Sequence, residues 1–133
     1  MLDFGSLNFI AILLAAVAKF MVGGLWFSKM LFGQLWLEEC GLKEDELGSP
    51  KNAMIIGFGT CLLVAFSFAV ILQLMAIDLR SALAVGVIAA IGITSAQLGL
   101  SYAFEGRSLK LFLIYATQCV AEFTVVVLIL SLM

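Results

Sequence analysis

Histidine is absent from this sequence of 133 residues, and charged residues make up only 12% of it. Without histidine, the chain lacks the usual general base and the commonest metal ligand. The cysteines Cys40, Cys61 and Cys119 are odd in number and far apart, so they form neither a disulfide framework nor a Cys-x-x-Cys metal pair. Basic residues form no cluster and the formal net charge is -2, which argues against a surface that binds nucleic acid.

The motifs that carry enzyme chemistry are missing as well. The sequence contains no serine or cysteine nucleophile beside a base, no glycine-rich phosphate loop and no paired acids that would bind a divalent ion. We therefore expect a protein that is not an enzyme and that has no metal site and no cofactor.

Apolar residues dominate what is present. They make up 64% of the chain, and the mean hydropathy is +1.20, whereas soluble domains are about 45–50% apolar. A hydrocarbon core about 30 Å thick needs about 20 apolar residues in a helix. The runs that reach this length are 9–27, 53–76, 82–104 and 111–133. Because backbone groups in lipid must bond within their own segment, we predict an all-α polytopic membrane protein, a single domain over 1–133 with four transmembrane helices in an antiparallel bundle.

The residues around these runs predict how the helices begin and how they are oriented. Ser49 and Ser108 are suited to cap the second and fourth helices. The first run follows no basic residue and precedes no cleavage site, so we expect it to be retained. The basic residues of the loops 28–52 and 105–110 are Lys29, Lys43, Lys51, Arg107 and Lys110, whereas Arg80 lies on the other side. This excess predicts that both loops are cytoplasmic and both termini outside.

The long loop contains a short amphipathic segment. Apolar residues spaced four apart give residues 29–39 one apolar helical face, which predicts a short helix lying at the membrane surface. Aromatic residues near the ends of the spans are typical of interface anchors. The residues expected to anchor the cytoplasmic interface are Trp26, Trp36 and Tyr102.

Two charged residues, Lys19 and Glu122, lie within the apolar runs. A lone charge at mid-bilayer costs roughly 2.5–3.5 kcal/mol or more, so each needs a partner. Lys19 shares a helical face with Ala11, Ala15 and Gly23, small residues of the kind that mark close helix contact. Counted from the cytoplasmic ends of their helices, the two charges differ in depth by roughly 4–5 Å, which a lysine side chain can cover. We expect them to pair.

Small or polar residues at helical spacing predict a polar interior around this pair. The expected neighbours are Gln97, Gln118, Tyr115, Thr94, Ser101 and Thr60. Two roles remain open for the pair. As a permanent bond, within one chain or between two, it would fix helix packing. Alternatively, Glu122 or Lys19 would exchange a proton or bind an ion or polar solute, as charges inside membranes often do.

Two segments of the sequence are similar to a known family. They are Gly23-Gly24-Leu25-Trp26-Phe27-Ser28 and Arg107-Ser108-Leu109-Lys110. With them, the chain resembles over nearly its whole length a bacterial family of small four-span membrane proteins, the domain of unknown function 1761. The resemblance implies four helices in an inner membrane and supplies no catalytic residues. Members often carry a Tyr-His pair near the start of the last helix; Tyr115 matches the tyrosine, but Thr117-Gln118 stands in place of the histidine.

The leading hypothesis is a small non-enzymatic protein of the bacterial inner membrane that works as a homo-oligomer or as a subunit of a membrane complex. Its expected partners are the lipid bilayer and either a second copy or another membrane protein, with no nucleic acid. The alternative is a small proton- or ion-coupled transporter or channel that uses Glu122 and Lys19. A third hypothesis is a membrane-surface sensor that uses residues 29–39.

Overall fold

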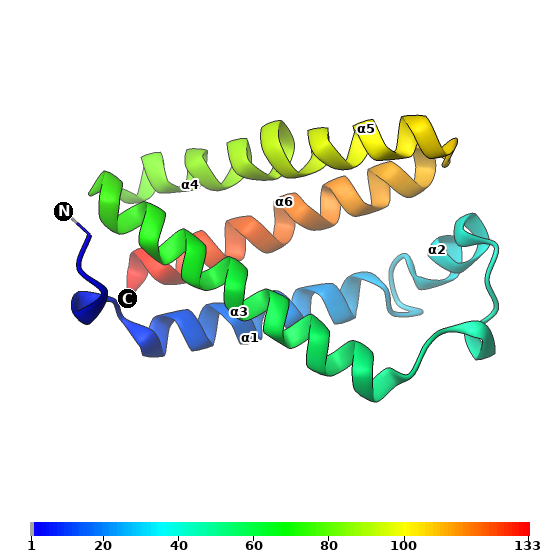
Figure 1. Ribbon diagram of the computed structural model, residues 1–133, viewed down its shortest axis with the longest axis horizontal. Helices are drawn as coiled ribbons and strands as arrows, with labels where there is room; N and C mark the ends of the chain where they lie inside the picture. The colour runs from blue at the N-terminus through cyan, green and yellow to red at the C-terminus, as the bar shows by residue number, and fades with distance from the viewer. Residues whose placement is uncertain (1) are drawn as a thin grey trace.

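The computed structural model describes residues 2–133, and these form helices and connecting turns only. Within this range, four helical stretches are long and apolar enough to cross a membrane: α1 (Phe9–Trp26), α3 (Pro50–Met75), the continuous stretch Leu79–Glu105, and α6 (Leu109–Leu132). Successive stretches run in opposite directions, and the described ends of the chain lie at the same end of the bundle (Figure 1). The predicted all-α membrane fold is confirmed.

Polar residues begin the helices ahead of the apolar runs. The Asn8 side chain accepts a hydrogen bond from the backbone N–H of Ala11, and the Ser108 hydroxyl accepts one from Leu111 N, each at 3.0–3.1 Å. Ser49 precedes α3 as predicted, but its side chain makes no capping bond, so its predicted capping role is wrong. Pro50 opens that helix instead, because its fixed φ suits a first helical turn and its missing N–H is not needed there.

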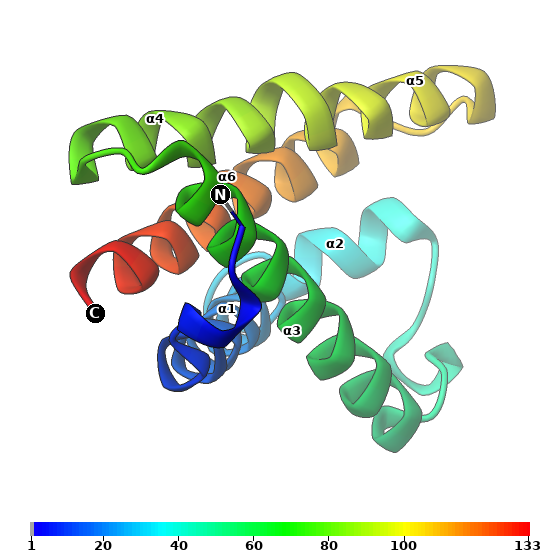
Figure 2. The same cartoon turned by 60° about the vertical axis from the view of Figure 1, so that its left-hand side comes forward.

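The core consists largely of alanine, which lets the helix backbones approach closely. Ala15, Ala16 and Ala65 have no exposed surface, and Val126 and Val127 are equally buried. Helix α1 packs against both α3 and α6, α3 also contacts α6, and the start of the third stretch packs on α6. Towards the loop end of the bundle, α3 diverges from the end of the third stretch, as both ribbon views show (Figures 1 and 2).

The third stretch is not a uniform α-helix. It consists of α4 (Leu79–Ile88), the π-helix η3 (Ala89–Ser95) and α5 (Ala96–Glu105). In a π-helix each N–H bonds to the carbonyl five residues earlier, so the turn is wider than an α-helical turn. A π segment therefore changes which face of the following helix points inward.

The consequence is visible in the burial pattern. Ala82, Gly86 and Ala90 are buried at steps of four, but the next buried residue is Ser95, five residues later, followed by Tyr102. The interior stripe predicted for this span assumed an uninterrupted α-helix and is therefore displaced. The residues of that stripe, Thr94, Gln97 and Ser101, are all exposed.

The loop end carries a shorter helix than predicted. Helix α2 spans Gly33–Cys40, whereas the sequence predicted residues 29–39. A short 3-10 turn, η2 (Glu44–Glu46), follows it, and another, η1 (Phe4–Ser6), precedes α1. The chain first makes a tight turn, in which Gly33 N donates to Ser28 O at 2.9 Å. A Cβ atom at position 33 would collide with backbone atoms of Ser28, so this close approach requires glycine and delays the helix.

Candidate functional site: a buried ion pair beside a cavity

Lys19 and Glu122 meet across α1 and α6. Lys19 Nζ lies 2.6 Å from Glu122 Oε2, and the two side chains are 13% and 6% exposed. Gln118, one turn earlier on α6, donates its Nε2–H to the other carboxylate oxygen at 2.6 Å. The pair therefore forms within a single chain, with Gln118 as the predicted polar neighbour.

A third helix contributes to the same site. Lys19 Nζ lies 3.8 Å from Cys61 Sγ, a weak acceptor on α3 that is buried. The sequence placed Cys61 within an apolar run but carried no signal that it lies next to Lys19. The ammonium group thus touches both helices that flank α1.

Gly23 allows the carboxylate to lie close to α1. A Cβ atom at position 23 would lie 2.8 Å from Glu122 Oε1, whereas the neighbouring Gly24 has nothing within 4 Å. Gly23 continues the small-residue face on which Ala11 and Ala15 are 1% and 0% exposed. The predicted face of α1 therefore contacts α6, and its glycine leaves room for the charged group.

A cavity of about 330 Å³ borders the pair on the side of the loops. Tyr115, Gln118, Thr60 and Thr94 line this cavity, although both threonines are exposed at its rim. The structure therefore brings these four predicted neighbours to the cavity and leaves two others outside it. Gln97 and Ser101, displaced by the π-helix, are exposed and do not line the cavity.

Sequence reasoning missed Ser95, which also lines the cavity. Its residue surface is 4% exposed, and its hydroxyl makes no hydrogen bond to any described group. A uniform α-helical register gives no reason to turn Ser95 inward; the extra residue of η3 does so.

The aromatic residues of the loop end attach to the bundle. Trp36 Nε1 donates to the Tyr115 hydroxyl at 2.8 Å, and Trp26 Nε1 donates to the backbone oxygen of Ile114 at 3.1 Å. These bonds tie α1 and α2 to α6. The anchoring of Trp26 and Trp36 at the membrane interface stays a prediction, with their indole N–H groups already used inside the protein.

Tyr102 is buried, with 6% exposure, so the prediction that it anchors the interface is wrong. Its ring packs edge-on against Tyr115, and Arg107 lies 5.0 Å from the ring centroid. Arg107 Nη1 also donates to the Tyr102 hydroxyl at 3.2 Å. This hydrogen bond, which favours the charged form, raises the pKa of Arg107.

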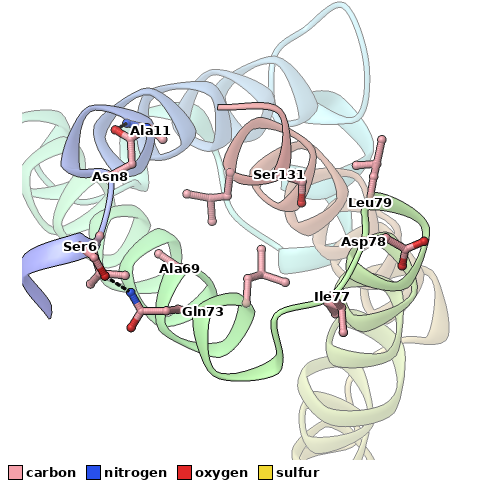
Figure 3. A pocket seen from close by; sticks show the side chains of 12 residues that line it. Ser6, Asn8, Ala11, Ala69, Gln73, Ile77, Asp78, Leu79 and Ser131 are labelled. Atoms are coloured by element: carbon pink, nitrogen blue, oxygen red, sulfur yellow. Dashed lines mark hydrogen bonds between the residues drawn. The ribbon is translucent and has the colours of Figure 1, made fainter. Parts of the chain in front are cut away.

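A second cavity, of about 420 Å³, lies at the opposite end of the bundle (Figure 3). Several of its polar groups already have partners: Gln73 Nε2 donates to Ser6 Oγ at 2.8 Å, and Asn8 caps α1. Asp78 caps α4, and its hydrogen bonds with Ser81 lower the pKa of the carboxyl group. These groups secure chain ends and turns, so this cavity is the weaker candidate site.

A packed layer separates the two cavities, which share no lining residue. In this layer Ala15 and Ala65 are fully buried, and the rings of Phe68 and Phe123 pack edge-on at 5.0 Å. These two cavities are therefore separate, and the one on the loop side borders the charged pair.

The model of one protein family matches residues 10–131 of the chain, nearly its whole length. That family is described as Protein of unknown function (DUF1761), the family that the two sequence segments resemble. No curated protein and no solved structure matches the chain.

We expect Gly23→Ala to destabilise the protein by about 1–3 kcal/mol, because the added methyl group displaces the Glu122 carboxylate from its partners. Unfolding in detergent micelles, followed by circular dichroism, measures this loss. Gly24→Ala is the matched control. It meets open space and gains helix propensity, so it should be neutral or stabilising by up to about 1 kcal/mol. Equal effects of the two substitutions would contradict the assigned geometry.

Proposed function

We propose a structural, non-enzymatic role for this chain, which belongs to the DUF1761 family. In this proposal it is a small integral membrane protein that works as a homo-oligomer or as a subunit of a membrane complex. The observation that carries the proposal is the buried pair, in which Lys19 and both Glu122 oxygens find partners within the chain. A pair in which each charged group is bonded within the chain favours a fixed helix arrangement over repeated uptake and release of a proton.

The pair supports a packing role because each charge depends on the other. Removing one partner of a buried pair leaves an uncompensated charge and typically costs about 3–5 kcal/mol. Within lipid, no water is present to hydrate the remaining charge. Lys19 and Glu122 therefore specify that α1 faces α6, because turning either helix away from the other would separate the two charges.

Self-association is supported by Gln97, whose side chain is exposed within a membrane span. It lies eight residues before the end of the span at Glu105, or about 12 Å along the helix axis. Ile93, Leu100 and Phe104 are exposed at helical spacing around it. A carboxamide facing acyl chains is costly, whereas the same face on a second copy supplies a hydrogen-bonding partner.

The location in this proposal is the bacterial inner membrane, with the lipid bilayer as an obligatory partner and no role for nucleic acid. The loops at 28–52 and 105–110 lie at one end of the bundle, and the described ends of the chain lie at the other (Figure 1). The loop end carries most of the basic residues, which supports cytoplasmic loops and termini outside.

The packing role is tested by a double-mutant cycle. We expect Lys19→Leu and Glu122→Leu each to destabilise the protein by about 3–5 kcal/mol, and the double variant to recover much of that loss. Chemical unfolding in mixed micelles measures the free energy of unfolding of each of the three variants relative to the wild type. The exposed Lys29–Glu44 pair, at 3.9 Å, is the control and should show little coupling. Additive losses at Lys19 and Glu122 would refute the packing role.

A second candidate function is transport coupled to a proton or an ion, favoured by the cavity that borders Glu122. The packed layer around Ala15 and Phe68 would have to open in such a cycle. Under the packing proposal, proteoliposomes with the wild-type protein pass no more protons or cations than protein-free liposomes. A wild-type flux that Glu122→Gln abolishes, with folding retained, would establish transport instead.

Self-association is tested by cross-linking in membranes. In a background without native cysteines, we expect Leu100→Cys to form disulfide-linked dimers on oxidation, because Leu100 lies on the same face as Gln97. Met21→Cys, exposed on α1, is the control and should remain monomeric. Gln97→Leu should weaken association by about 0.6–1.7 kcal/mol, the range for one interhelical hydrogen bond in a membrane. If Gln97→Leu associates as strongly as the wild type, the face around Gln97 is excluded as the association surface.

A further inference from the structure

We infer that the cavity beside the ion pair binds one neutral, mainly apolar molecule that carries a carbonyl or hydroxyl oxygen and enters from the bilayer. This inference is independent of the oligomeric state proposed above. It rests on the charge, the free hydrogen-bond donors, the walls and the opening of the cavity of about 330 Å³.

The charge of the site favours a neutral ligand. The charged residues that line the cavity are Lys19 and Glu122, whose side chains lie 2.6 Å apart and cancel each other. An ionic ligand would lose its hydration without meeting an unpaired counter-charge, which is unfavourable in an apolar site. A neutral molecule leaves the pair intact.

The hydrogen-bonding groups of the site favour a ligand with an acceptor oxygen. The Ser95 hydroxyl is buried, and it makes no hydrogen bond to any described group. The Tyr115 hydroxyl accepts a bond from Trp36, and the Tyr102 hydroxyl accepts one from Arg107, so each keeps its own proton to donate. A carbonyl or hydroxyl oxygen would accept from these groups and would satisfy Ser95, which is costly to leave unbonded.

The walls and the volume favour a ring-sized apolar body. Val64, Leu98 and Phe123 form apolar parts of the lining. A volume of about 330 Å³ lies near the lower end of the range for small-molecule sites, about 300–1,000 Å³. Such sites combine apolar walls with a small number of polar groups that orient the ligand, as here.

The opening of the cavity faces the side of the bundle. Thr60 on α3 and Thr94 on η3 are exposed at its rim, where α3 and α5 diverge (Figure 2). This side is at the depth of the transmembrane spans, so a ligand reaches the cavity through lipid. The Thr60 hydroxyl donates to its own helix at Gly57 O, at 2.7 Å, which lets it face an apolar solvent.

Ser95 also borders a groove of about 370 Å³ on the other side of η3, against α6. Apart from Ser95, the side chain there that carries a polar atom is Thr117, and its hydroxyl already donates to Leu113 O at 2.7 Å. That groove offers the acceptor oxygen of a ligand no side-chain donor besides Ser95. The cavity beside the pair is therefore the assigned site.

The test uses duroquinone, a fully methylated benzoquinone that resists addition by thiols, and durene, the methylated benzene without the two oxygens. The purified full-length protein is reconstituted in lipid nanodiscs, and binding is followed by equilibrium dialysis and by the unfolding temperature. We expect saturable binding of duroquinone with a rise in Tm, and much weaker binding of durene. Equal binding of the two compounds, or no saturable binding of duroquinone, would overturn the inference.

Variants locate the site. We expect Ser95→Ala to weaken duroquinone binding roughly threefold to tenfold, the equivalent of one hydrogen bond. Ser67→Ala is the matched control and should have no effect, because Ser67 is exposed on α3 and donates to Leu63 O. Filling the cavity with Val64→Phe should abolish binding, whereas Ala116→Leu, which fills the other groove, should not. Binding that survives Val64→Phe but is lost in Ala116→Leu would overturn the assignment of the site.

The route of entry is tested with the same nanodiscs. The rate of binding is measured rather than the occupancy, because at equilibrium the amounts of duroquinone in lipid and in water are proportional and occupancy is the same for either route. Thr94→Phe, at the lateral opening, should slow both association and dissociation of duroquinone. Unchanged rates would refute entry from the bilayer.

Discussion

The contact between Lys19 and Glu122 is the interaction on which the rest of the structure depends. Two ionised groups within a membrane are tolerated only together, and their 2.6 Å contact therefore fixes α1 against α6. Gln118 donates a hydrogen bond to the second carboxylate oxygen of Glu122, and Gly23 leaves room for that carboxylate beside α1. Because α1 also packs on α3, and α4 packs on α6, the alignment of this central pair of helices determines where both outer helices lie.

The π-helix η3 is the second feature with consequences beyond its own length. Wider turns of this kind often occur at functional sites. Here the extra residue directs Ser95 into the protein and leaves Gln97 outside. One register change thus creates both features that the charged pair does not explain: a buried hydroxyl beside the cavity and a polar side chain facing the membrane. The proposed ligand site and the proposed association face lie on different sides of α5 for this reason.

Among the aromatic residues at the loop end, Tyr102 was predicted at the membrane interface but is buried inside the bundle. Trp26, Trp36 and Tyr102 lie near the ends of the spans, where interface anchors are common. In the structure Tyr102 is buried, and both indole N–H groups bond to α6. An amphipathic aromatic side chain buries its apolar ring and needs one hydrogen-bonding partner for its polar atom. Lipid headgroups and the interior of a helix bundle can both provide these surroundings. Sequence position alone does not distinguish these surroundings.

The sequence by itself determined the four spans and the pairing of Lys19 with Glu122, because the length of an apolar run and the cost of a lone charge in lipid leave few alternatives. Local spacing also identified the inward faces of α1 and α6. Only the tertiary structure decided the inward face of the third span, the position of Cys61 beside Lys19, and the cavity lined by Ser95. Those features depend on a π-helical step and on how three helices meet, which helical periodicity within one segment does not encode.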